Sequence, residues 1–193
     1  MINKPPGLPF LAVFSAAAGV ILIWASYPYW YGPEMFLFAV PVGWLLLAYW
    51  AIRMVWADRK GTLTGGLGSR WFWPWFVVGG VVFALITDAP FWIRFTISEP
   101  SMNAYAKAVV ENPDHEEPCQ WVGLYYVCDG WDYLDLDTGE RVPGSAEFAV
   151  QDWFLYDNKG FLWLPSGEPD ETADDSYRHL KDHWYGAEGW DHW

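Results

Sequence analysis

Three long apolar runs fill the first half of the chain. They are LPFLAVFSAAAGVILIWASY, MFLFAVPVGWLLLAYWAI and a third run that begins WFWPWFVVGGVVFALIT. A helix needs about 17–25 such residues to cross the ~30 Å hydrocarbon core of a bilayer. Inside lipid the backbone polar groups must find partners within the chain, and a helix provides them. The pattern therefore predicts three transmembrane helices, over residues 8–27, 35–52 and 71–93.

The loops between these runs differ in their basic residues. The loop after the second run carries Arg53, Arg59, Lys60 and Arg70, whereas the loop before it, PYWYGPE, has no Lys or Arg. Because basic loops stay on the cytoplasmic side, we expect a cytoplasmic N-terminus, an extracytoplasmic C-terminal half and a multi-pass protein of the cell membrane. A cleaved signal peptide is the alternative for the first run. Only Lys4 precedes that run, and no clear small-x-small cleavage site follows it.

The first apolar pattern of the second half is helical. SEPSMNAYAKAVVEN has a capping residue in Ser98 and ends before Pro113. Its apolar residues follow the i, i+3, i+4, i+7, i+8 spacing of an amphipathic helix; they are Met102, Tyr105, Ala106, Val109 and Val110. We expect this helix to pack on a sheet.

Extended patterns follow and predict about four strands in a meander. QWVGLYYV (120–127) is apolar on both faces, as in a covered central strand, and WDYLDLDTGERV alternates around the turn DTGE. AEFAVQDWFLYD and GFLWLP flank the turn DNKG and predict a hairpin. The predicted fold is a membrane α-helical region with three transmembrane helices (1–96), followed by a small extracytoplasmic α+β domain with an antiparallel sheet (97–193).

The net charge divides the chain at the same place. Residues 97–193 carry five Lys and Arg against twenty-one Asp and Glu (net −16), and residues 1–96 carry six against three (net +3), which together give the net −13. A domain this acidic repels phosphate, so we expect no nucleic-acid partner. We expect membrane lipids and a protein partner instead, and a basic partner would complement the charge best.

The two cysteines test the strand prediction. Cys119 and Cys128 lie in a compartment that favours disulfides. They also bracket the predicted strand 120–127, and nine extended residues span roughly 30 Å. Bonded cysteines have Cα atoms within about 7 Å of each other, so a strand and a bond exclude each other. We favour the strand and expect no bond; if the two are bonded, the chain must fold back near Gly123.

RHLKDHWY (178–185) is predicted as a short helix that carries the metal candidates. His179 and His183 are four residues apart, and Asp175 lies one turn earlier, so the three side chains could share one face and hold a metal. The zinc-protease motif HExxH is absent, because Leu180 follows the first histidine. The alternative is an amphipathic surface helix whose histidines face water. We favour this structural interpretation and expect no cofactor.

Catalytic motifs are not recognisable in the sequence. Neither cysteine has the context of a nucleophile, and the glycine-rich GTLTGGLG lacks the GK[ST] ending of a phosphate loop. The outer domain has many aromatic residues, which are common anchors at interfaces. The sequence therefore favours a membrane-anchored extracytoplasmic interaction module that binds another protein or the envelope surface. The alternative is an extracytoplasmic membrane-bound enzyme, which could be metal-dependent.

Three spans followed by VGLYYV, GFLWLPSGEP and SYRHLKDHWY resemble a group of actinobacterial membrane proteins for which no activity is established. In these proteins a short outer domain carries a Gly-Leu-Tyr strand, a Gly-Phe strand that ends in Pro-x-Gly, and a Tyr-x-His-Leu segment before Trp-Tyr. The resemblance covers the outer domain best and the spans only by their order. It implies three spans with a short extracytoplasmic C-terminal domain, and it implies no catalytic residue.

Overall fold

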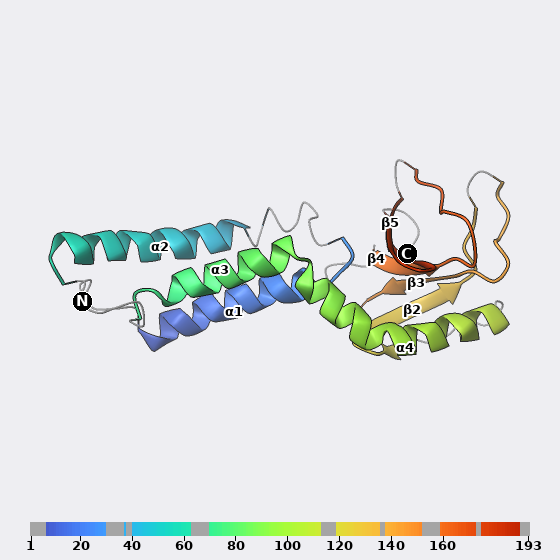
Figure 1. Ribbon diagram of the computed structural model, residues 1–193, viewed down its shortest axis with the longest axis horizontal. Helices are drawn as coiled ribbons and strands as arrows, with labels where there is room; N and C mark the ends of the chain where they lie inside the picture. Colours follow the sequence, from blue (N-terminus) through green and yellow to red (C-terminus); the bar gives the residue numbers. More distant parts are fainter. Residues whose placement is uncertain are drawn as a thin grey trace. The chain divides into compact units, whose positions relative to one another are not determined.

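The computed structural model describes residues 7–29, 37, 40–62, 70–112, 119–135, 138–151, 159–172 and 175–189. The chain forms two compact units, and Figure 1 shows their helices and strands. The first, the helical unit, contains Met1–Ser26 and Trp30–Pro90. The second, the sheet unit, contains Tyr27–Tyr29 and Phe91–Trp193. The sheet unit thus begins inside the third predicted span, and it also includes Tyr27, the last residue of the first predicted span, and the two residues that follow it.

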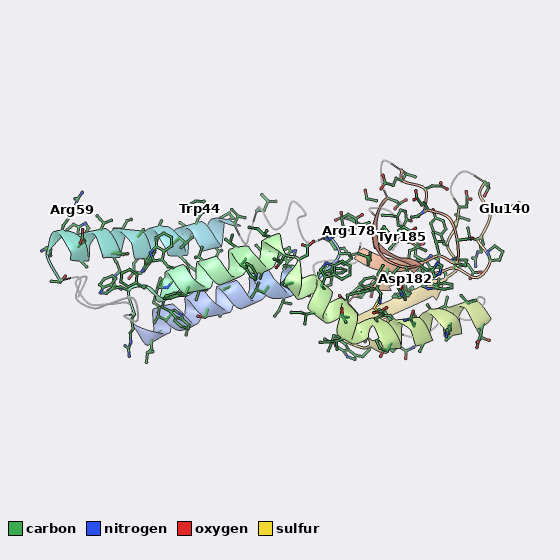
Figure 2. The ribbon with its side chains drawn as sticks, in the orientation of Figure 1. Trp44, Arg59, Glu140, Arg178, Asp182 and Tyr185 are labelled. Carbon is green, nitrogen blue, oxygen red and sulfur yellow. A yellow bond between two sulfur atoms is a disulfide. The ribbon has the colours of Figure 1, made fainter. Side chains whose placement is uncertain are left out.

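The helical unit contains three apolar helices, α1 (Leu8–Trp24), α2 (Val40–Arg59) and α3 (Trp73–Ile86). α1 packs against both of the others. Apolar side chains also cover the outer sides of these helices, where Trp44 and Phe83 are each 68% exposed; Trp44 is labelled in Figure 2. Helices that are apolar on all sides are typical of buried or membrane environments.

Only α2 is long and apolar enough to be a membrane span by itself. α3 and α4 (Ala89–Glu111) meet the same criterion only as one broken span, and α1, with 17 residues, is too short for it. The described residues therefore contain one or two candidate spans, which favours membrane association, and the three predicted spans are not confirmed. Each predicted span differs from the helices found: α1 ends at Trp24, before Tyr27, α2 continues past Ile52 to Arg59, and a turn at Thr87–Asp88 interrupts the third.

The sheet unit contains a six-stranded antiparallel sheet, which confirms the predicted sheet and adds two strands. Its order is β1-β2-β3-β4-β6-β5. The strands β1 to β4 pair in sequence order as a meander, but they are not the four predicted strands, because β1 and β2 divide the predicted strand 120–127. After them, β6 pairs with β4, and β5 lies at the edge (Figure 1). The strands are β1 (Gln120–Val122), β2 (Tyr125–Trp131), β3 (Ala146–Val150), β4 (Lys159–Trp163), β5 (Ser176–Lys181) and β6 (Trp184–Glu188).

Helix α4 covers one face of the sheet, as the apolar stripe predicts. Met102, Tyr105 and Val109 are buried against the sheet, where the Tyr105 ring packs on Phe148 at a centroid distance of 5.1 Å. The predicted start of this helix is wrong, because α4 begins at Ala89. Ser98 therefore lies inside the helix and caps nothing; its Oγ accepts a hydrogen bond from the Leu124 backbone N–H at 2.9 Å.

The predicted strand 120–127 is wrong, and so is the expectation that the cysteines are not bonded. Cys119 and Cys128 form a disulfide with Cα atoms 4.2 Å apart. The chain folds back at Gly123, as the alternative requires, so that β1 and β2 form a hairpin with Trp121 opposite Tyr126. Gly123 has φ +65°, and a Cβ there would lie 2.7 Å from the Ser98 Cα. Only glycine suits both the backbone angle and the space.

The predicted helix at 178–185 is also wrong, because this segment is the β5–β6 hairpin. Its turn is Asp182–His183, where Asp182 has φ 50°. Leu180 and Trp184 are buried in the core beneath α4. The spacing of these two residues fits one face of a helix, but it also fits a hairpin that turns between them. The segment forms strands and not a helix, because β6 pairs with β4 along its whole length.

The two predicted turns have different outcomes. Leu134 and Arg141 form an isolated antiparallel bridge around DTGE. The described residues next to this bridge do not extend it into a strand. Asp135 holds this turn: its Oδ1 accepts the Thr138 N–H at 2.9 Å and its carbonyl accepts the Gly139 N–H at 2.8 Å. The DNKG turn falls largely outside the described residues, although the strands β3 and β4 that flank it pair as predicted.

Candidate functional site

Most aromatic side chains in the described part of the sheet unit form its core and are not available as interface anchors. The buried ones are Tyr27, Tyr29, Phe91, Phe95, Tyr105, Tyr125, Tyr133, Phe148, Phe161, Trp184 and Tyr185. Their rings pack edge to face around Phe161, which lies 4.9 Å from Tyr125 and 6.4 Å from Trp184 between centroids. The general aromatic content therefore reflects packing, and any binding role falls to the few rings that remain exposed.

Four exposed large apolar side chains lie on α4 and on the β1–β2 hairpin in the described part of the sheet unit, and we call this set the collar. It consists of Ile93 and Ile97 on α4, Trp121 on β1 and Leu124 in the β1–β2 turn. Their exposed fractions are 62%, 59%, 65% and 45% respectively. Leu134 is the other exposed large apolar residue among the described part of this unit, and it belongs to the DTGE turn.

The hairpin part of the collar is fixed to α4. The guanidinium of Arg94 donates two hydrogen bonds to the Leu124 carbonyl, from Nη2 at 2.7 Å and from Nε at 3.2 Å. The Leu124 N–H donates to Ser98 Oγ, and the Cys119–Cys128 disulfide closes the base of the hairpin. The collar is therefore a braced surface, which lowers the conformational entropy lost on binding.

Residues Tyr27–Tyr29 are built into the same unit. The guanidinium of Arg94 lies 4.9 Å from the Tyr27 ring centroid and 4.0 Å from that of Tyr125. Arg178, labelled in Figure 2, donates from Nη1 to the Pro28 carbonyl at 3.4 Å. A Cβ at Gly186 would overlap the Pro28 ring, so this close approach requires glycine. The segment that leaves α1 is thus a structural part of the sheet unit.

A buried acid lies on the other face of the sheet. Glu147 on β3 is 7% exposed, and Tyr177 Oη donates to its Oε1 at 3.4 Å. Burial raises the pKa of Glu147 to about 7; a hydrogen bond from Trp131 opposes this shift, and the nearby Asp175 carboxylate adds to it. The pattern AEFAV contains this acid, and its apolar alternation predicts only a strand there. The signal was a charged residue within a strand that is otherwise apolar.

Two tyrosines enclose this acid. The rings of Tyr133 and Tyr177 meet edge to face at 5.9 Å, and Tyr133 Oη accepts the Asp170 N–H at 3.0 Å. Burial raises the pKa of Tyr133 to about 12 and raises that of Tyr177 further. Both phenols therefore stay protonated at neutral pH, and Glu147 is the group of this cluster that titrates in that range.

The candidate metal ligands do not share a helical face. Asp175 is buried and accepts a hydrogen bond from the Thr172 hydroxyl at 3.3 Å. His179 Nε2 hydrogen-bonds the Asp182 carbonyl at 3.1 Å, while the His183 ring packs edge to face on Trp163. Within the described ranges, no three His, Cys, Asp or Glu side chains are grouped as metal ligands. Asp175, His179 and His183 were candidates because a helix would place them on one face. In this hairpin they do not lie on a helical face.

No protein-family model, curated protein or solved structure matches this chain. The resemblance to actinobacterial membrane proteins therefore stays a prediction. Any function must be argued from the collar, the helical unit and the acid cluster themselves.

Proposed function

We propose that this protein is a membrane-anchored extracytoplasmic interaction module, which binds another protein or the envelope surface through the collar. The observation that carries the proposal is Trp121, which is 65% exposed at the end of a hairpin braced by a disulfide and by Arg94. Tryptophan is the residue most enriched among binding hot spots. The Trp121 ring contacts the Tyr126 ring across the hairpin at a centroid distance of 5.4 Å, yet most of the side chain faces water, and a binding partner is the best explanation for this exposure.

The exposed side chains of the helical unit support the membrane anchor. Large apolar residues are exposed on each of its three helices, for example Val20 on α1, Leu45 on α2 and Ile86 on α3. Soluble monomers rarely expose contiguous apolar patches larger than a few hundred Å². Lipid removes this cost, because hydrocarbon tails solvate such side chains.

The composition of the sheet unit supports the proposed topology. Tyr27–Tyr29 and Phe91–Trp193 belong to one unit, so both lie on the same side of a membrane. The chain between them must then cross an even number of times, and α2 and α3 are the apolar helices available. α1 adds a third crossing from the opposite side. The basic loop after α2 then favours a cytoplasmic N-terminus.

The enzyme alternative depends on Glu147. A pKa of about 7 suits a general acid or base. However, Glu147 is buried and already accepts a hydrogen bond from Tyr177. Hydrogen-bond networks that only stabilise the fold raise pKa values in the same way as catalytic sites do. Trp121 on the collar has the exposure that a binding role needs, and for this reason we prefer the interaction module.

Photo-crosslinking in intact cells tests the proposal. A photoreactive amino acid replaces Trp121 in the full chain, and a matched control carries it at Glu140, an exposed position in the DTGE turn of the same unit. We expect capture of a protein or lipid at position 121 well above that at 140. Equal capture at both positions would show that the collar is not a binding surface. An intact Cys119–Cys128 bond, checked by mass spectrometry, verifies that each variant is folded.

A further inference from the structure

The geometry points to a lipid partner: we propose that the collar lies in the headgroup region of the outer leaflet of the membrane that anchors the chain. This inference rests on the proposed function, since it names the partner of the same surface. It commits to the host bilayer in preference to a protein, for reasons that begin with the length of α3.

α3 is too short to cross a bilayer alone. Its 14 residues rise about 21 Å as a helix, which leaves roughly 9 Å of the ~30 Å hydrocarbon core. α4 starts only two residues later, and the two helices meet the span criterion together. The two helices meet at an angle of 58°, so each residue of α4 adds less than its full rise of about 1.5 Å along the direction of α3. The boundary between lipid and water then falls within the first turns of α4, which include Arg94 and Ile97.

The exposed side of α4 changes character at this boundary. Ile93 and Ile97 are exposed near its start, whereas Lys107 and Glu111 are exposed near its end. A helix that faces water carries polar residues along its whole outer side. The first two turns of α4 therefore have the surface of a helix in lipid, and the last two turns have that of a helix in water.

The β1–β2 hairpin is held at the same depth. Leu124 is hydrogen-bonded through its carbonyl to Arg94 and through its N–H to Ser98, both in the first turns of α4. The exposed Leu124 side chain therefore lies beside these turns, and Trp121 lies three residues earlier, on the face of β1 opposite the buried Val122. Tryptophan prefers the interface, where its ring meets acyl chains and its N–H meets water.

The charge distribution agrees with a lipid partner. The collar contains no acid, and Glu99, the acid closest to it along α4, is held by Lys181 at 2.7 Å. Exposed carboxylates lie elsewhere on the sheet unit, for example Glu140, Glu168 and Asp182; Glu140 and Asp182 are labelled in Figure 2. An acidic unit can approach a membrane that contains anionic lipids only with a surface that lacks such groups.

Spin labelling of the full chain tests this depth. Both cysteines of the sequence are in the disulfide, so one added cysteine can be labelled selectively. A nitroxide is placed at Ile97→Cys, at Trp121→Cys and, as a control on the same helix, at Lys107→Cys. The chain is reconstituted into vesicles of phosphatidylethanolamine and phosphatidylglycerol. Accessibility to oxygen, which concentrates in lipid, is compared with accessibility to a water-soluble nickel chelate.

We expect the ratio of oxygen to nickel accessibility to be several-fold higher at 97 and 121 than at 107. A second substitution, Leu124→Glu, should lower the ratio at 97, because it places a charge at the proposed boundary; Leu124→Ile should leave it unchanged. Water-like ratios at all three positions would overturn the inference. Mass spectrometry of the Cys119–Cys128 bond confirms folding of each labelled variant.

The outcomes separate this inference from the proposed function. If labels at 97 and 121 are water-exposed while crosslinking at 121 captures a protein, the lipid inference is wrong and the interaction module stands. If crosslinking at 121 captures nothing and the labels are water-exposed, both are wrong. Capture of lipid together with high oxygen ratios supports both.

Discussion

The two units differ in where their apolar side chains lie. In the helical unit, apolar side chains point outwards as well as inwards, and an added Cβ at Gly79 or Gly80 would meet no atom within 4 Å. In the sheet unit the large buried side chains meet specific partners, and an added Cβ at Gly123, Gly130 or Gly186 would lie less than 3 Å from another atom. The helical unit is thus specified mainly by its environment, whereas the sheet unit is specified by its internal contacts.

Removing a core ring should show the largest difference between the units. Phe161 is fully buried and packs against four other rings, so Phe161→Ala should lower the free energy of unfolding of the sheet unit by about 3–5 kcal/mol. Phe83→Ala on the exposed side of α3 should change the stability of the detergent-solubilised protein little. Proteolysis of each variant in denaturant measures both. Equal effects would contradict the contrast.

Breaking the disulfide should have the next largest effect, and only on the sheet unit. The bond closes a short loop, because Cys119 and Cys128 are nine residues apart. Replacing both cysteines with Ser should lower the free energy of unfolding of this unit by about 2–4 kcal/mol and loosen the collar. Helicity of residues 8–86, followed by hydrogen exchange, should not change. Exchange that stays slow at Leu124 in the Ser variant would show that Arg94 and Ser98 hold the hairpin without the bond.

The stability of the sheet unit should depend on pH through Glu147. Its carboxyl has a pKa of about 7 in the folded state against 4.5 ordinarily, so between these values the folded state binds a proton that the unfolded state has lost. The free energy of unfolding should therefore fall as pH rises from about 4.5 to 7, by up to about 3 kcal/mol. Glu147→Gln should flatten this dependence. A profile that is the same in both proteins would assign the pH effect to other groups.

Alanine substitutions at two glycines, one in each unit, should give the smallest difference in stability between the units. Gly186→Ala places a methyl group against Pro28 and should cost about 1–3 kcal/mol through overpacking. Gly80→Ala, which meets nothing, should stabilise α3 by about 0.5–1 kcal/mol through its higher helix propensity. Thermal unfolding in detergent should therefore shift in opposite directions. A decrease for both would mean that α3 has a close neighbour at Gly80.

The sequence predicted those elements whose pattern has a single interpretation. The stripe from Met102 to Val109 fits only one helical face, and AEFAV with GFLW fits only a covered hairpin, so both are confirmed. The segments around Gly123 and Asp182 failed for a common reason. Each is a hairpin whose two strands continue one apolar pattern through a two-residue turn, so periodicity alone shows no interruption there.

The candidate site was less predictable, because it depends on contacts between distant residues. Trp121 is visible in the sequence, but its exposure follows from the turn at Gly123, which Ser98 and Arg94 fix across more than twenty-five residues. Glu147 becomes notable only when its burial against Tyr177, thirty residues away, is known. The shared face of the metal candidates depended on a helix, and residues 178–185 form a hairpin instead.

The insertion of Tyr27–Tyr29 into the sheet unit has a consequence for biogenesis. These residues leave the ribosome long before Trp184 and Gly186, yet the unit is complete only when both segments meet. On the proposed topology, insertion of only one of the two helices α2 and α3 would leave the two segments on opposite sides of the bilayer. The sheet unit could not then close, and its exposed core would mark the chain for degradation. Completion of the fold thus acts as a checkpoint on membrane insertion.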